Sequence, residues 1–313
     1  MNRSIIKHLL NMMGSHLCLP KSQSEECERR RGKTMAELGR DRFSALPESL
    51  VIIEILSRTS PRDVCRFSAI SRGFKSVADS DSVWDRFLPS DHRKIISRSV
   101  YPVAFSTKKQ LYFLLADGFV LLDGGKLSFS LDKASGKKCF MLGARELAIE
   151  CGRFPVNWTW RHLPQSRFWE QANLRAAPCF DISGKIEARL LSPKTTYVVY
   201  LLFDLGPLKY GYKGLPAKAS VRFEGERGDG NGAGDGDEIT NIVSLAIRRF
   251  SSGSGGQFAQ QRMDKWMETE LGEFFNGQGN TGEVEIRLMG FEGDYRTYDL
   301  FVEGIELRPK IDS

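Results

Sequence analysis

Histidine and cysteine are the side chains from which proteins most often build metal sites and activated nucleophiles. The four histidines, His8, His16, His92 and His162, each stand apart from any cysteine or carboxylate at a ligand or triad spacing. The six cysteines, at positions 18, 27, 65, 139, 151 and 179, include no C-x-x-C pair. We therefore expect reduced thiols, no metal, no cofactor and no catalytic residue, and a protein that is not an enzyme.

One acidic, glycine-rich segment, Asp229 to Glu238, has the composition of a calcium-binding loop. Its spacing is wrong, because Ala233 falls at a ligand position and Thr240 stands where the bidentate Glu belongs. We predict a solvated loop at this place.

A strongly apolar segment is the first feature that points to binding. Six of the seven residues from Leu50 to Leu56 are apolar, so they cannot form a single stripe on a helix. A helix that is apolar on all sides must be buried on all sides, and a unit of about fifty residues has few helices with which to cover it. Either the rest of the chain or another protein has to cover this segment, and these residues alone leave both possibilities open.

The elements around this segment are short helices followed by strands. Ser60-Pro61-Arg62-Asp63 is a helix start, in which the Ser and Asp side chains satisfy free amides and Pro has no amide to lose. A further turn ends before Pro89, and we expect Trp84 to pack it. A helix capped by Ser106 over 106–116 and a hairpin turn at Asp132 to Gly136 come next.

From about residue 138 the hydrophobic period changes to two, as in half-buried antiparallel strands. The apolar positions that alternate with charged ones are Ile186, Ala188 and Leu190, then Val284, Ile286 and Leu288, then Ile305 and Leu307. The segment 197–203 is apolar throughout and predicts a central strand. Eight or nine short strands without long helices indicate a β-sandwich or jelly roll.

Composition and charge limit the class of protein. The 313 residues are 41% hydrophobic and 27% charged, enough for about two domains, and no apolar run of membrane-spanning length occurs. The net charge is +6, of which residues 1–42 carry +4 as a basic tail that we expect to be disordered. A nearly neutral folded part does not suit nucleic-acid binding. We expect a cytoplasmic or nuclear protein without nucleic-acid or membrane partners.

Residues 43–90 resemble an F-box in the order and spacing of their motifs. These are Phe43 to Glu48, Ile53 to Arg58, Ser60 to Phe67, Ser71 to Phe74, and Trp84. The resemblance implies docking on the Skp-type adaptor of a cullin-RING ubiquitin ligase. It implies adaptor contacts from Leu46, Pro47, Leu50, Ile53 and Leu56, and apolar anchors of this kind supply most of the energy of an interface.

The remainder resembles a phloem-protein-2-like domain of the Nictaba-like lectin family. Lys137 to Leu147, Trp158 to Trp160, Leu163 to Phe168, Gly184 to Ile186 and Leu191 to Tyr197 carry this resemblance in order. It implies a β-sandwich and a carbohydrate site that uses Trp158, with Trp160 on the same side of an extended strand. One alternative is that both rings are core residues, because Trp is mostly buried in proteins. Another is that the surface binds protein, because Cys151 and Cys179 occupy usual Trp positions and offer no ring to stack on a sugar.

We therefore predict an α+β protein in which a small all-helical F-box precedes an antiparallel, jelly-roll-like β-sandwich. The boundaries are 1–42 for the tail, 43–90 for the F-box, 91–137 for a connecting segment with one helix and a hairpin, and 138–310 for the sandwich. The predicted function is substrate recognition in a Skp-cullin-F-box ligase, with the sandwich binding a target protein directly or through its glycans. The alternative is an intracellular lectin that acts without ligase assembly.

Overall fold

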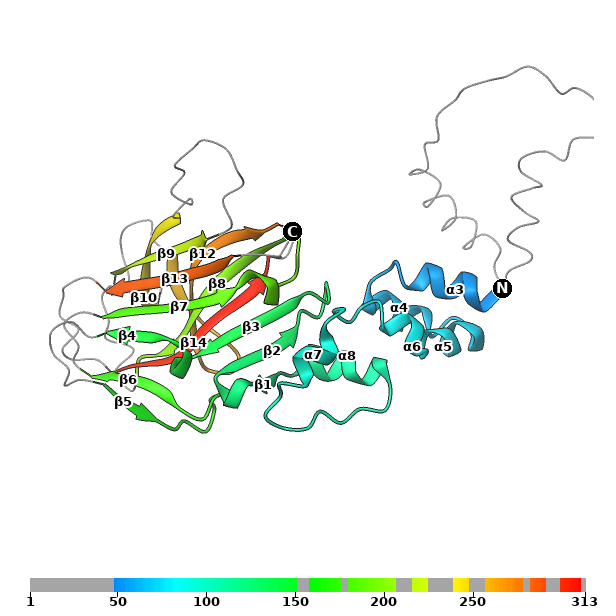
Figure 1. The fold of residues 1–313 in the computed structure, drawn as a ribbon, viewed down its shortest axis with the longest axis horizontal. Helices are drawn as coiled ribbons and strands as arrows, with labels where there is room; N and C mark the ends of the chain where they lie inside the picture. The colour runs from blue at the N-terminus through cyan, green and yellow to red at the C-terminus, as the bar shows by residue number, and fades with distance from the viewer. Residues whose placement is uncertain are drawn as a thin grey trace, which may run out of the picture. The chain divides into compact units, whose positions relative to one another are not determined.

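The computed structural model describes residues 48–150, 158–175, 180–206, 216–224, 239–247, 257–277, 282–290 and 299–310. Helices come first in the chain and strands follow, which confirms the α+β class (Figure 1). The expected tail over 1–42, the acidic segment at 229–238, Cys151, Cys179, Leu46 and Pro47 lie outside these residues. Within the described ranges, no helix has the length and apolarity needed to cross a membrane.

Four short helices follow one another at the start of the described chain: α3 (Glu48–Leu56), α4 (Pro61–Phe67), α5 (Arg72–Ala78) and α6 (Asp81–Trp84). We call α3 to α6 the helical unit. The predicted helix start is confirmed, because the Ser60 hydroxyl accepts a hydrogen bond from the Asp63 amide at 3.2 Å and Pro61 occupies the first turn. Ser71 caps α5 in the same way through the amide of Phe74.

Trp84 is the largest buried side chain of the helical unit. Its ring is fully buried, and its indole N–H donates to the carbonyl of Ala78 at 2.6 Å. The rings of Tyr112 and Phe113 each lie 5.2 Å from the Trp84 ring, centroid to centroid. The predicted core role of Trp84 is therefore confirmed, and its neighbours on α8 (Lys108–Asp117) extend this core beyond the helical unit.

The connecting segment contains more structure than expected. A second helix, α7 (His92–Ile96), precedes α8, and α8 is capped by Thr107 rather than Ser106. Helix α7 has only five residues and no side-chain cap at Asp91, so the sequence carries no signal for it. Beyond α8, β1 (Val120–Leu122), the 3₁₀ turn η2 (Asp123–Gly125) and β2 (Leu127–Leu131) follow. Strand β2 pairs with β3 (Lys138–Gly143) across the predicted hairpin turn, which is confirmed.

The first layer of strands contains β1, β2 and β3, which continue into β14 (Asp299–Pro309), β8 (Thr195–Asp204), β12 (Met267–Asn276) and β11 (Gln257–Gln261). A short branch is formed by β5 (Trp158–Arg161) and β6 (Gln171–Arg175), and β6 pairs with the first half of β14. All pairs within this layer are antiparallel, as the sequence predicts.

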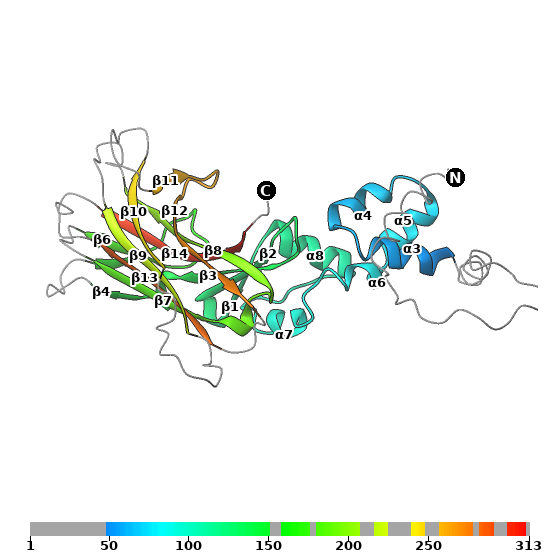
Figure 2. The same ribbon diagram turned by 90° about the horizontal axis from the view of Figure 1, so that it is seen from above.

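The second layer begins at β10 (Ile239–Ile247), which pairs with β11 in parallel, and continues through β9 (Pro216–Glu224), β13 (Glu283–Gly290), β7 (Asp181–Glu187) and β4 (Ala148–Glu150). Figures 1 and 2 show this curled arrangement of strands. The layers meet face to face at Gly184 of β7, where a Cβ would lie 3.0 Å from Leu142 of β3 and 3.7 Å from Ile305 of β14. The contact is that of a β-sandwich.

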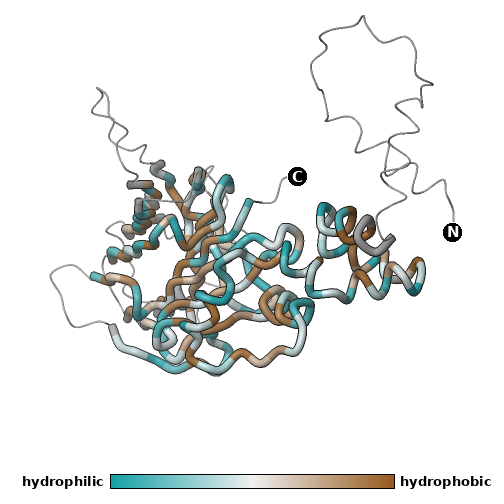
Figure 3. Tube along the Cα trace, turned by 45° about the vertical axis from the view of Figure 1, so that its right-hand side comes forward, coloured by the Kyte–Doolittle hydropathy of each residue, from teal (hydrophilic) through white to brown (hydrophobic). Residues whose placement is uncertain are grey.

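The core lies between the layers, where hydrophobic stretches of the strands come together (Figure 3). Val284, Ile286 and Leu288 are fully buried, so this predicted alternation is confirmed. The alternation over 186–190 is only partly right, because β7 ends at Glu187 and the 3₁₀ turn η4 (Ala188–Leu190) follows; a similar turn, η3 (Ala144–Glu146), follows β3. The solvated position predicted for Glu306 is wrong, since its side chain is buried in an ion-pair network.

Candidate functional site

Helix α3 carries the residues predicted to contact an adaptor. Leu56 is fully buried and Ile52 is 8% exposed, whereas Ile53 and Ile55 are half-buried. The main neighbours of α3 are α5 and α6 of the same helical unit. The expectation that Leu56 contacts an adaptor is therefore corrected, because its side chain belongs to the core of the helical unit. Leu50 lies on α3, but its side chain is outside the described structure.

The polar side of α3 is defined by Glu54. Its carboxylate pairs with Arg58 at 2.6 Å and with Arg86 at 3.2 Å, and all three side chains are well exposed. A surface pair of this kind contributes little to stability. The half-buried Ile53 and Ile55 therefore lie on either side of a solvated charge cluster in the sequence. They form a partly exposed apolar surface that the charged side chains border.

Of the two tryptophans of β5, Trp160 packs against the sandwich core. Trp158 and Trp160 lie opposite Leu174 and Ala172 of β6, and both of these partners are buried in the sandwich core. Trp160 is half-buried against that core, and the guanidinium carbon of Arg145 lies 3.5 Å from its ring centroid. A cation stacked at this distance covers a ring face that a sugar would need. The structure thus gives Trp160 a packing role, while the side chain of Trp158 is outside the described part.

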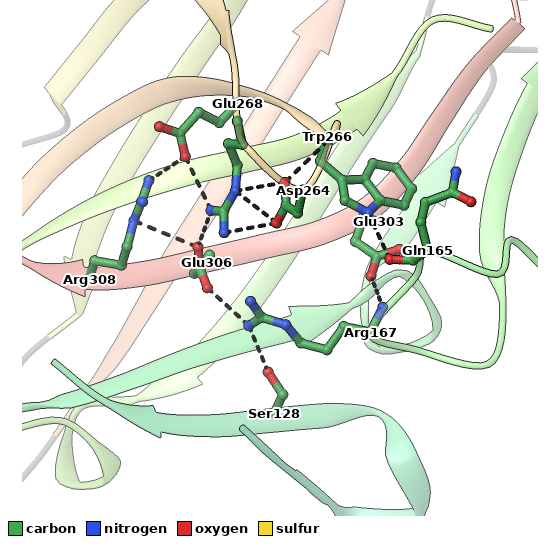
Figure 4. A network of polar contacts seen from close by, with 10 residues as sticks. Ser128, Gln165, Arg167, Asp264, Trp266, Glu268, Glu303, Glu306 and Arg308 are labelled. Atoms are coloured by element: carbon green, nitrogen blue, oxygen red, sulfur yellow. Dashed lines mark hydrogen bonds and ion pairs between the residues drawn. The ribbon is translucent and has the colours of Figure 1, made fainter. Parts of the chain in front are cut away.

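A buried ion-pair network lies on the side of β14 that faces away from Ile305, Leu307 and the sandwich core (Figure 4). Glu306 is 4% exposed. Its carboxylate contacts Arg167 and Arg262 at 2.9 Å each, and Arg308 at 3.6 Å. Glu268 bridges two of the same arginines, at 2.6 Å to Arg308 and 3.3 Å to Arg262. Burial opposes the ionisation of Glu306, but Arg167, Arg308 and Arg262 outweigh it and lower its pKa.

A second buried carboxylate, Glu303, holds the loop between β5 and β6. It accepts hydrogen bonds from the Ser166 hydroxyl at 2.6 Å and from the Arg167 amide at 2.7 Å. Gln171, also buried, donates to the carbonyl of Phe168 at 2.8 Å and accepts from the amide of Leu163 at 3.0 Å. Burial raises the pKa of Glu303, and the two hydrogen bonds oppose this shift. These contacts fix the loop before any ligand arrives.

The fixed loop forms one wall of a groove of about 450 Å³, which we call the aromatic groove. Its most exposed rings are Trp169 at 60%, Tyr101 at 56% and Phe119 at 44%. His162 also lines it, and its Nδ1 lies 2.9 Å from the carbonyl oxygen of Trp169. A carbonyl only accepts, so Nδ1 carries the proton in this contact.

Sequence reasoning did not find the three exposed rings of this groove. The motif Leu163 to Phe168 carries part of the family resemblance, and Trp169 follows it directly. Tyr101 and Phe119 come from the connecting segment, so nothing in the sequence order brings them to the same place. The position of Trp169 beside a family motif was the one sequence signal for this groove, but the exposure of its ring depends on the fold. Among the described residues, no group of three or more His, Cys, Asp or Glu side chains is placed to hold a metal.

Comparison with known proteins identifies both parts of the chain. Residues 43–86 match the F-box domain, and residues 137–309 match the family Phloem protein 2. The Arabidopsis thaliana F-box protein At2g02240 is 37% identical, covering 89% of this chain and 83% of its own length. F-box protein PP2-B10 from the same plant is 38% identical, covering 85% and 94%.

The solved structures that match are much less similar. TmCBM61, a carbohydrate-binding module in complex with β-1,4-galactotriose, aligns with a TM-score of 0.26 and 15% identity over 55% of this chain and 88% of its own. A likeness this weak transfers no ligand. The F-box match, the family match over most of the strands and the relatives that cover both parts agree with one another. The chain therefore belongs to the F-box proteins that carry a phloem protein 2 domain.

Proposed function

We propose that this protein is a substrate-recognition subunit of a Skp-cullin-F-box ubiquitin ligase. The surface of α3 around Leu50 and Ile53, together with Leu46 and Pro47, docks on the Skp-type adaptor. The β-sandwich binds the target protein, and a glycan on that target is one candidate for what it binds. Holding the target beside the ligase raises the local concentration of its lysines near the ubiquitin-loaded enzyme. The chain performs no bond chemistry of its own in this role.

One observation supports adaptor docking above the others. Helix α3 is apolar at six of the seven positions from Leu50 to Leu56, yet its own helical unit buries only Ile52 and Leu56 among the described side chains of this run. Ile53 and Ile55 stay half-buried. Apolar side chains left beside solvent in this way are typical of a surface that another protein covers.

Capture of a Skp-type adaptor by the purified full chain tests this proposal. We expect wild type to retain the adaptor and the double variant Leu50→Asp with Ile53→Asp to lose it. The matched control is Met263→Asp, which changes a fully exposed apolar side chain between β11 and β12 and should leave capture intact. Amide hydrogen exchange over α4 to α6 shows whether the helical unit of each variant is folded. Equal capture by the double variant and wild type would contradict the proposal.

A further inference from the structure

The aromatic groove has the properties of a recognition site that the docking of α3 does not use. Tyr101 and Phe119 come from the connecting segment and Trp169 from the β5–β6 loop, so the connecting segment and the β-sandwich together build the groove. We propose that this groove binds an extended peptide segment of the target protein, in which a large apolar side chain stands next to a carboxylate. The inference rests on the proposed role of the β-sandwich in target capture and names the chemistry of the target.

The walls of the groove favour an apolar side chain. Besides the exposed rings, Val103, Leu114 and Leu121 line it. Trp169 is 60% exposed, although the loop that carries it is pinned by Glu303 and Gln171. A rigid, exposed tryptophan loses little conformational freedom on binding, and such residues are frequent energetic centres of interfaces.

Few polar groups of the groove are free to bind a ligand. The Ser99 hydroxyl donates to the carbonyl of Tyr101 at 2.8 Å, and the Ser166 hydroxyl is engaged by Glu303, Phe168 and Gln171. A sugar ring needs a hydrogen-bond partner for most of its hydroxyls when it leaves water. The groove therefore suits a peptide side chain better than a polyhydroxylated ring.

The charges around the groove favour a carboxylate in the ligand. No Asp or Glu is among the described residues that line it, whereas the cationic Arg167 is. The Arg167 guanidinium lies 4.8 Å from the Phe119 ring centroid, and only its Nη1 is engaged by Glu306 and Ser128 in the described structure. The remaining N–H donors of the Arg167 guanidinium are complementary to a carboxylate.

The backbone beside the groove is also available. In the described part of the chain, residues 102–105 form no backbone–backbone hydrogen bond, although Pro102, Val103 and Ala104 line the groove. An extended peptide can pair with such a free segment while its side chains enter pockets, as in strand addition. This third feature distinguishes a peptide from a compact ligand.

Selection from a random twelve-residue peptide library on the full chain tests the proposal, with the Trp169→Ala variant for counter-selection. We expect the enriched peptides to share a large apolar residue next to Asp, Glu or a free C-terminal carboxylate. Fluorescence anisotropy of one such peptide should show binding weakened about tenfold or more by Trp169→Ala. The matched control Phe275→Ala, which removes a 61% exposed ring from β12, should leave binding unchanged.

Variants of the peptide identify the source of the carboxylate. Replacing the side-chain Glu by Gln, or amidating the C-terminus, should weaken binding about tenfold in one of the two cases. No Trp169-dependent enrichment would overturn the inference, and so would binding of oligosaccharides on a glycan array that Trp169→Ala abolishes. Because these assays contain no adaptor, they fail independently of the adaptor-capture experiment.

Discussion

Glu303 accepts a 2.6 Å hydrogen bond from the hydroxyl of Ser166, although 137 residues separate them in the chain. Through this contact the last strand, β14, holds the loop that carries Trp169 beside the aromatic groove. A buried carboxylate at this position is a costly way to hold a loop, since burial disfavours its charged form. The geometry of the groove therefore depends on a residue that does not line it.

Substitutions of Glu303 should separate its charge from its hydrogen bonds. Glu303→Gln keeps an acceptor for the Arg167 amide and removes the buried charge, but it presents an N–H donor to Ser166 in place of an acceptor, so the free energy of unfolding at neutral pH should change little. Glu303→Ala leaves the Arg167 amide without this acceptor and removes one partner of the Ser166 hydroxyl, so it should lower the free energy of unfolding by about 1–3 kcal/mol. Urea denaturation of the two variants measures the difference, and equal losses would contradict this account.

The pH dependence of Glu303 has a definite sign. Burial raises its pKa in the folded state above the ordinary value of 4.5. Its stabilising contribution is therefore complete below that value and declines as the pH rises through the folded-state pKa. Glu303→Gln should remove this decline, which urea denaturation across acidic and neutral pH would detect.

Glu306 should show the opposite behaviour. Its folded-state pKa is lowered, so its contribution is present above 4.5 and is lost as the pH falls through the folded value. Glu306→Gln leaves Arg167 without its carboxylate partner and takes one carboxylate from Arg262 and Arg308, so it should cost about 3–5 kcal/mol in the free energy of unfolding at neutral pH. The control Glu285→Gln breaks a more exposed pair with Arg222 and should cost less than about 1 kcal/mol. Equal losses in the two variants would show that the network does not stabilise the fold.

A close backbone approach makes Gly304 sensitive to any side chain. A Cβ at this position would lie 2.0 Å from the carbonyl oxygen of Leu142 on β3, a backbone atom that cannot turn away. We expect Gly304→Ala to destabilise the sandwich by about 3 kcal/mol or more, measured by thermal unfolding. Gly277→Ala is the matched control, because its Cβ would meet only the Phe275 ring at an ordinary 3.8 Å. A similar melting temperature for both variants would disprove this reading of β14.

Local signals in the sequence were sufficient for the elements that local chemistry determines. The Ser60 cap, the hairpin turn after β2 and the alternation over β13 all depend on neighbouring residues, and all three were predicted. Position on a sheet face is a different matter. Glu306 was expected in water because it alternates with Ile305 and Leu307, but both faces of β14 are covered, which only the assembled loops and layers determine.

The candidate sites show the same division. The apolar run on α3 was visible in the sequence, but the side of the helix that its own unit buries was not, and Leu56 proved to be a core residue. The rings of the aromatic groove come from distant segments of the chain. Tyr101 and Phe119 both lie at least about fifty residues before Trp169, so only the fold brings the three rings together. The Trp158 and Trp160 pair was found from spacing, but spacing does not tell which face of β5 meets the core.

Leu56 and Ile53 should therefore respond differently to truncation. Leu56→Ala removes a fully buried side chain from the helical unit and should cost about 2–5 kcal/mol in the free energy of unfolding. Ile53→Ala removes a half-buried side chain and should cost less, while it weakens adaptor capture. Urea denaturation followed by circular dichroism at helical wavelengths distinguishes them. A larger loss of stability for Ile53→Ala would assign Ile53 to the core instead.

Amide hydrogen exchange with and without a Skp-type adaptor tests adaptor docking most directly. The account predicts that binding slows exchange over α3, residues 48–56, and leaves the strands of the sandwich unchanged, because the adaptor contacts α3 and the residues just before it and not the sandwich. Slower exchange confined to the strands, or no change over α3 in a complex that forms, would contradict it.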